Sequence, residues 1–92
     1  MDIEWDATRD QQNIVKHGVS FAFAARAFGE RMVQWRDVRA DYAESRWIGL
    51  ADIENRVYAI VWTMRGPDRY RIISARKANE RETKTFREQT RP

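Results

Sequence analysis

The chain has 92 residues, of which 42% are hydrophobic and 34% are charged, and its formal net charge is +3. It contains no cysteine and one histidine, His17, which excludes disulfides and thiolate metal sites and argues against a zinc site made by the protein alone. Because no apolar run approaches the ~20 residues of a membrane-spanning helix and the length suits one modest core, we expect a single cytoplasmic domain over residues 1–92, without metal, cofactor or membrane contact.

The first third of the chain predicts a short edge strand over residues 2–5 and two helices, over residues 7–16 and 21–28. In the second helix, apolar residues recur at i, i+3, i+4 and i+7 and predict one buried face. Residues with suitable capping chemistry bracket both helices: Asp6 and Ser20 before them, Gly18 and Gly29 after them.

Four strands are predicted next, separated by the polar loop 36–45 and by the turn 65–68. β-branched and aromatic residues dominate 56–64 on both faces, which is typical of a central strand, and the turn predicts a hairpin with the strand that follows. The four predicted strands cover residues 31–38, 45–53, 56–64 and 69–75.

A final helix is predicted after residue 79. Asn79 and Glu82 have the spacing of a capping box, and Phe86 is the only large apolar residue in the helix. The predicted order is β-α-α-β-β-β-β-α. We therefore expect an α+β fold, a small and mainly antiparallel sheet with two N-terminal helices and a C-terminal helix, all on one face of the sheet.

The charge is unevenly distributed along the chain. Residues 1–45 have a net charge of −2, residues 46–92 have a net charge of +5, and fourteen of the seventeen cationic residues are arginine. Arginine binds phosphate through planar, bidentate contacts, so this composition favours a polyanionic partner. A GC-rich genome also produces arginine-rich surfaces, which leaves a purely structural interpretation open.

Basic residues lie near the ends of the two strongest strands. We expect Arg65, Arg71, Arg76 and Lys77 to converge on one end of the sheet, where each pairs with a carboxylate such as Glu82 or Glu44 or faces a phosphate. Strict alternation along the last strand gives two sets of side chains on opposite faces: Arg69, Arg71, Ile73 and Ala75 on one, Tyr70, Ile72 and Ser74 on the other.

The remaining motifs narrow the possible chemistry. The sequence has no glycine-rich phosphate loop and no carboxylate pair at metal-binding spacing, and neither Ser20 nor Ser74 has a neighbouring base. Catalysis would therefore use Lys, Arg, His and Glu. This set suits RNA cleavage, in which the 2′-hydroxyl is the nucleophile, a base removes its proton, cations stabilise the phosphorane and an acid protonates the leaving oxygen.

Two separated blocks resemble the signatures of the BrnT family of toxins: "WDATRDQQNIVKHGVSFAFAARAF" at residues 5–28 and "RIISARKANERETKTF" at residues 71–86. Their order and spacing agree with the family, and the resemblance covers nearly the whole chain. Two positions depart from it, since Arg9 stands where lysine is common and Phe86 stands where tyrosine is usual. The matching positions are Trp5, Asp6, Asn13, Lys16, His17, Gly18, Val19, Phe21, Ser74, Ala75, Arg76 and Glu82.

The resemblance implies a RelE-like fold and a ribonuclease that arrests translation. It also implies a BrnA-like antitoxin with a ribbon-helix-helix region, a heterotetramer of toxin and antitoxin that represses its own promoter, and DNA contact only through the antitoxin. The catalytic candidates are Lys16, His17, Arg65, Arg71, Arg76 and Glu82, and the RNA-binding candidates are Arg46, Arg69 and Lys77.

Within this set, we expect the arginines Arg65, Arg71 and Arg76 to hold the scissile phosphate, and Lys16, His17 or Glu82 to transfer protons. The alternative is a non-catalytic basic module that holds an antitoxin or nucleic acid. The four tryptophans are interpreted as core or interface residues in preference to base-stacking platforms.

Overall fold

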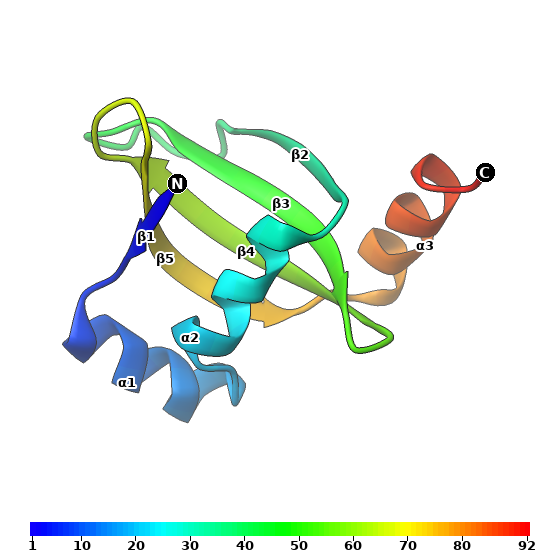
Figure 1. Cartoon of the computed structure of the whole chain (residues 1–92), viewed down its shortest axis with the longest axis horizontal. Helices are drawn as coiled ribbons and strands as arrows, with labels where there is room; N and C mark the ends of the chain where they lie inside the picture. Colours follow the sequence, from blue (N-terminus) through cyan, green and yellow to red (C-terminus); the bar gives the residue numbers. More distant parts are fainter.

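In the computed structural model, which describes residues 1–92, five strands form one sheet in the order β1-β5-β4-β3-β2 (Figure 1). The elements in chain order are β1 (Asp2–Glu4), α1 (Ala7–His17), α2 (Phe21–Ala24), the 3₁₀ helix η1 (Ala25–Gly29), β2 (Met32–Asp37), β3 (Arg46–Ile53), β4 (Arg56–Met64), β5 (Arg69–Lys77) and α3 (Glu80–Gln89). The predicted α+β class and element order are confirmed. As predicted, β4 is central and β1 is an edge strand; β1 pairs with β5 in parallel, and all other pairs are antiparallel. None of the helices has the length and apolar character that crossing a membrane needs.

The predicted caps of α1 and the predicted N-cap Ser20 of α2 form as expected, but Gly29 lies inside η1 without a left-handed conformation and does not cap the second helix. The Asp6 carboxylate accepts a hydrogen bond from the backbone N–H of Arg9 at 2.9 Å, and Gly18 ends α1 in the left-handed conformation with φ of 72°. The predicted second helix divides into α2 and η1. The tighter 3₁₀ turn places residues three apart on the same side, so Ala24 and Ala27 are both fully buried against the sheet.

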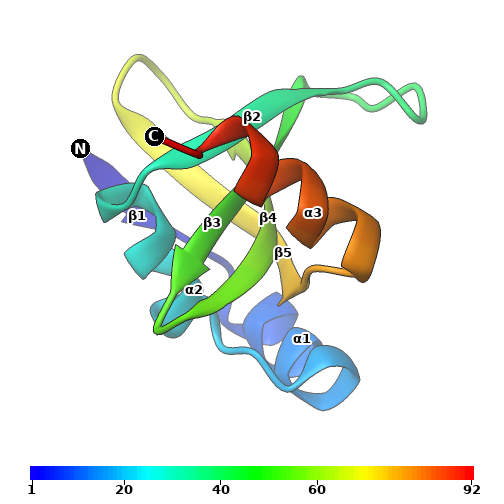
Figure 2. The ribbon, with the colours of Figure 1, turned by 90° about the vertical axis from the view of Figure 1, so that its right-hand side faces the viewer.

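The sheet is covered on both faces, and the prediction of helices on one face only is wrong. Alternation along β4 sends Ile60 and Trp62 into a core with α2 and η1, and Val57 and Ala59 into a second core with Phe86 of α3. Figure 2 shows α2 and α3 on either side of β3 and β4. A strand that is apolar on both faces permits helices on both, and the sequence pattern alone does not distinguish these arrangements.

The ladder between β4 and β5 contains a β-bulge in which Ile73 has no partner on β4. Ile72 and Ala75 therefore pack in the same hydrophobic cluster, although strict alternation predicts opposite faces for them. That prediction is wrong from the bulge onward. The extra residue places Arg76 on the same face as Arg71, which is the face that carries α3.

Candidate functional site

A row of polar side chains crosses all five strands on the α3 face of the sheet. The backbone register aligns Glu4, Arg71, Thr63, Arg46 and Asp37, one residue from each strand. Because neighbouring strands lie about 4.8 Å apart, the Cα atoms of Arg46 and Arg71 are roughly 10 Å from each other. The two guanidinium groups are thus held on one surface with a hydroxyl side chain between them.

The Glu4 carboxylate, on the edge strand β1, holds the β5 end of this row. Arg71 donates to Glu4 at 2.8 Å, and Arg69 lies 3.4 Å from the other oxygen of the same carboxylate. Arg71 therefore pairs with a residue 67 positions away, and the expected pairing with Glu82 or Glu44 is not found. Both partners are about one-third exposed, so the pair is open to solvent.

The Arg76 guanidinium and the Glu82 carboxylate form a bidentate ion pair between β5 and α3. Arg76 Nη1 and Nη2 donate to the two Glu82 oxygens at 2.8 and 2.9 Å. Glu82 Oε1 also accepts from the Asn79 backbone N–H at 2.9 Å, as the predicted capping box requires. The hydrogen bond from Arg76 lowers the pKa of Glu82, and the Glu82 carboxylate raises the pKa of Arg76. The pair is therefore doubly ionised at neutral pH.

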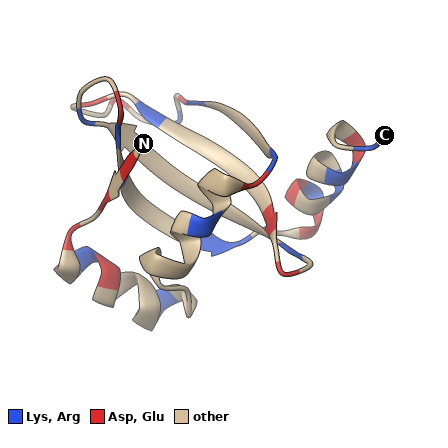
Figure 3. Ribbon diagram, in the orientation of Figure 1, with Lys and Arg blue, Asp and Glu red and all other residues tan.

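This pair and the polar row lie on the same face but are separated along the strands. Arg71 is opposite Thr63 and Arg76 is opposite Ala59 on β4, which puts their Cα atoms about 13 Å apart at the usual rise per residue. Figure 3 shows acidic and basic positions interspersed along α3 and around the strand ends. The face thus offers two arginine sites, each with a carboxylate partner.

A loop that the sequence shows only as polar adds a third site. Asp37 is 4% exposed, and its carboxylate accepts from Arg39 Nε and Nη2, each at 2.8 Å, and from the Tyr42 hydroxyl at 3.2 Å. These contacts, of which the Arg39 hydrogen bond is the largest, lower the pKa of Asp37 to about 2. Sequence reasoning missed this site, for which the Asp-x-Arg spacing at the end of a strand was the available signal.

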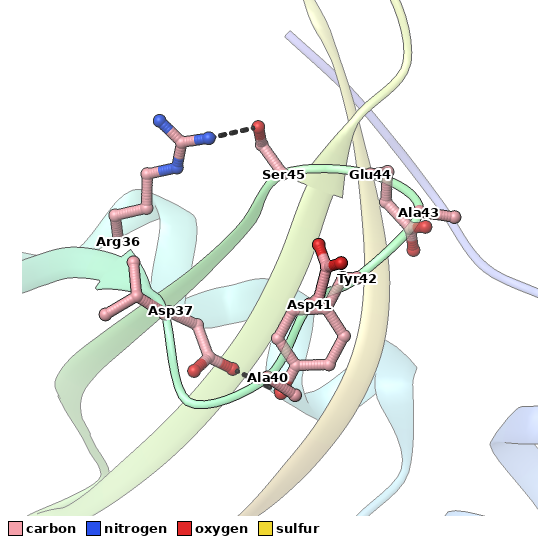
Figure 4. A pocket seen from close by; sticks show the side chains of 9 residues that line it. Arg36, Asp37, Ala40, Asp41, Tyr42, Ala43, Glu44 and Ser45 are labelled. Atoms are coloured by element: carbon pink, nitrogen blue, oxygen red, sulfur yellow. Dashed lines mark hydrogen bonds between the residues drawn. The ribbon is translucent and has the colours of Figure 1, made fainter.

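The same loop borders a hollow of about 260 Å³ that is open to solvent and lined by residues 36–38 and 40–45. Figure 4 shows the Tyr42 ring beside the Asp37 carboxylate, and the Arg46 guanidinium lies 4.2 Å from the centre of that ring. Arg46 also pairs with Glu44 at 3.3 Å. The loop is therefore attached to β3 by stacking and by charge.

We expect Asp37→Asn to lower the free energy of unfolding by about 1 kcal/mol at pH 7. The effect is small for such a pair because the Arg39 side chain is exposed and solvent screens its charge. The pKa in the folded protein lies below the ordinary value of 3.8, so the stabilisation is present above about pH 4 and is lost as the pH falls toward 2. Urea unfolding at pH 7 and pH 2.5 measures this, with the exposed Asp41→Asn variant as control. A difference between wild type and Asp37→Asn that is equal at both pH values would contradict the assignment.

The predicted convergence of four basic residues at one sheet end is not found. Arg65 follows β4 at the turn, whereas Arg76 and Lys77 end β5 at the opposite end of the hairpin, about 20 Å and about 23 Å away at the usual strand rise. Lys77 faces the other side of the sheet, in a hollow of about 380 Å³ beside Tyr58 and Phe23. Because β4 and β5 are antiparallel, their C-terminal ends lie at opposite edges of the sheet, and residues that follow the two strands are far apart.

Lys16 and His17 form the last turn of α1, beside the open edge of β5. Neither forms a hydrogen bond or ion pair with Arg76 or Glu82. Phe86 is 3% exposed and anchors α3 in the core, so the position where the resembling family usually has tyrosine points away from the exposed face. No three His, Cys, Asp or Glu side chains lie together as ligands for a metal ion.

Comparisons with known proteins place these features in a family. A family model described as "Ribonuclease toxin, BrnT, of type II toxin-antitoxin system" matches residues 5–82. The structure is similar to the 1.1 Å crystal structure of the Brucella abortus ribonuclease toxin, BrnT, with a TM-score of 0.64 and 24% identity over 87% of this chain and 99% of that one. No curated protein matches the chain. At this identity, the match to the crystal structure supports the fold.

Proposed function

Because the chain belongs to the BrnT family, the ribonuclease toxins of type II toxin–antitoxin systems, we propose that it is a metal-independent endoribonuclease that cleaves mRNA and arrests translation. Family membership implies an antitoxin partner. That partner is a BrnA-like ribbon-helix-helix protein, which neutralises the toxin in a heterotetramer. The complex represses its own promoter, and DNA is contacted only by the antitoxin.

The observation that carries this proposal is the solvent-accessible bidentate Arg76–Glu82 pair between β5 and α3. A guanidinium has five N–H donors, and the Arg76 side chain is 36% exposed, so it can bind a phosphate without leaving its position at the end of β5. Glu82 fixes the orientation of that guanidinium before the substrate arrives. Such a preorganised donor stabilises the charge that develops on the phosphorane.

Proton transfer in the proposed reaction starts at Glu82. The ionised Glu82 carboxylate accepts the proton of the 2′-hydroxyl, the O2′–P bond forms and the P–O5′ bond breaks, which gives a 2′,3′-cyclic phosphate and a free 5′-hydroxyl. When phosphate engages the N–H groups of Arg76, the main cause of the lowered Glu82 pKa weakens, and the carboxylate becomes a better base. Lys16 or His17 donates the proton that the leaving 5′-oxygen takes up.

The other basic residues hold the RNA strand on either side of the scissile phosphate. Arg46 and Arg71, in the polar row, bind the backbone about 13 Å from Arg76 as measured along the strand direction. Arg65 and Arg69 extend this binding surface toward the turn. Lys77, the last residue of β5, faces the other side of the sheet and binds RNA that passes around the end of the strand.

We expect the purified chain to cleave single-stranded RNA in EDTA at a rate within about twofold of the rate with Mg²⁺, since its side chains supply the charge stabilisation that a metal ion otherwise gives. Gel analysis of a labelled RNA with sub-stoichiometric protein measures this, together with the 2′,3′-cyclic end. Cleavage that stops in EDTA and returns with Mg²⁺ would contradict metal independence.

Expression of the chain without antitoxin tests the biological role. Growth arrest with fragmented RNA is the expected result. Normal growth with intact RNA at confirmed protein levels would overturn the ribonuclease proposal. Salt-sensitive RNA binding without cleavage would favour the non-catalytic basic module.

A further inference from the structure

Trp35 differs from the other three tryptophans in its surroundings. Trp62 is 2% exposed in the α2-side core, and Trp5 and Trp47 pack against that core. Trp35 is 40% exposed and belongs to neither core. An exposed tryptophan on β2 contributes little to the packing of the fold, so its ring is available for another contact.

A mainly apolar hollow of about 300 Å³ lies next to this ring, between the sheet and α3. The four α3 residues in its wall recur at i, i+1, i+4 and i+8, which places them along one side of the helix. The hollow is lined by Trp35, Leu50, Arg81, Glu82, Thr85 and Gln89.

The hollow shares Glu82 with the Arg76–Glu82 pair. A group bound in the hollow therefore contacts the residue to which the proposed function gives the role of base. The exposed Arg81 and Gln89 side chains supply hydrogen-bond donors and acceptors at its rim. A flat aromatic wall with a polar rim suits a planar, polar-edged ring.

We propose that this hollow binds one base of single-stranded RNA next to the scissile phosphate, with the base stacked on Trp35; the inference rests on the proposed ribonuclease function. Stacking on an aromatic side chain is available to every base, and hydrogen bonds from Arg81 and Gln89 to the base edge add a preference among them. The hollow thus holds the nucleotide whose 2′-hydroxyl gives its proton to Glu82. An antitoxin segment is a different occupant, but the shared Glu82 and the neighbouring arginines favour the nucleotide.

A binding experiment with a non-cleavable RNA tests this site. The probe is a fluorescein-labelled single-stranded 2′-O-methyl RNA, which lacks the nucleophile, and its Kd is measured by fluorescence anisotropy. We expect Trp35→Ala to raise Kd about 10-fold or more and Trp35→Phe to keep most of the affinity, because phenylalanine retains an aromatic face. Val38→Ala, at an 80% exposed apolar residue just after β2, is the control and leaves Kd unchanged. Thermal unfolding of each variant verifies that the fold is intact.

A cleavage assay on unmodified RNA, with wild-type antitoxin added in parallel, separates the possible outcomes. A shifted cleavage-site preference in Gln89→Ala, at wild-type stability, supports a base in the hollow. If Trp35→Ala leaves the Kd and the cleavage pattern unchanged while the wild type is active, the base-binding inference is overturned and the proposed ribonuclease function stands. Loss of neutralisation by antitoxin in Trp35→Ala, with RNA binding unchanged, would assign the hollow to the antitoxin. A wild-type chain that neither binds nor cleaves RNA would overturn the proposed function itself.

Discussion

Arg76→Ala is expected to slow RNA cleavage by about 100- to 1000-fold, the usual effect of removing one preorganised donor to a developing charge, and to abolish growth arrest. The substitution removes the guanidinium that we propose holds the scissile phosphate. It also leaves Glu82 without the two hydrogen bonds that orient its carboxylate. Single-turnover cleavage of a labelled RNA, at protein concentrations above Kd, measures the chemical step without the contribution of binding.

Two further variants test whether the reaction needs the planar guanidinium or only a positive charge at this position; the second of them is a control. Arg76→Lys keeps the positive charge but loses the planar fork, so we expect it to recover only part of the activity. Arg91→Ala removes an exposed cation beyond the end of α3 and is expected to cleave like wild type. The capping box between Asn79 and Glu82 remains in all three variants, so α3 should stay folded. Wild-type cleavage by a folded Arg76→Ala protein would show that the reaction takes place elsewhere.

Most of the fold was predictable because its signals are local. The caps at Asp6 and Ser20, the left-handed Gly18 and the capping box at Asn79 each depend on residues within a few positions. The central position of β4 followed from apolar side chains on both of its faces. Such features need no information about which distant segments meet.

The errors lie where the structure depends on distant contacts. The bulge at Ile73 is a mismatch between two strands, so alternation along β5 alone does not reveal it. The face that α3 covers depends on where Phe86 finds a core, and one apolar residue does not specify that.

In the candidate site, too, the contact between residues close in the sequence was predictable and the contact between distant residues was not. Arg76 and Glu82 are six residues apart across a strand–helix junction, and the structure joins them. Arg71 pairs instead with Glu4, at the far end of the chain. The Asp37–Arg39 pair lies at the end of β2, where the Asp-x-Arg spacing was its only signal in the sequence.

Asn13 makes the side-chain hydrogen bonds that join the two sequence blocks. It is 6% exposed, and its Nδ2 donates to the carbonyl oxygens of Val19 and Ala75, each at 2.8 Å. Its Oδ1 accepts from the Ala75 N–H at 3.2 Å. Beyond residue 71, β5 has no strand partner on this side, because β1 pairs only with residues 69–71. The Asn13 amide therefore satisfies backbone groups at the edge of β5 that a neighbouring strand would otherwise bind.

We expect Asn13→Ala to lower the free energy of unfolding by about 3 kcal/mol, because the change leaves two carbonyls and one N–H without their partner in a buried site. For a domain of this size, that loss is a large part of a total of about 5–14 kcal/mol and corresponds to a drop in Tm of about 12–20 °C. Thermal and urea unfolding measure both quantities. The matched control is Gln12→Ala, the preceding and exposed residue of α1, for which we expect a change within about 0.5 kcal/mol.

The effect on cleavage should depend on temperature. Ala75 directly precedes Arg76, so the Asn13 amide also fixes the strand end that places the Arg76 guanidinium. Well below the Tm of the variant, Asn13→Ala should keep more activity than Arg76→Ala, since the guanidinium is still present. Equal stability of Asn13→Ala and Gln12→Ala would mean that water replaces the amide at the edge of β5 at no cost, and the three hydrogen bonds would then not account for the attachment of α1 to the sheet.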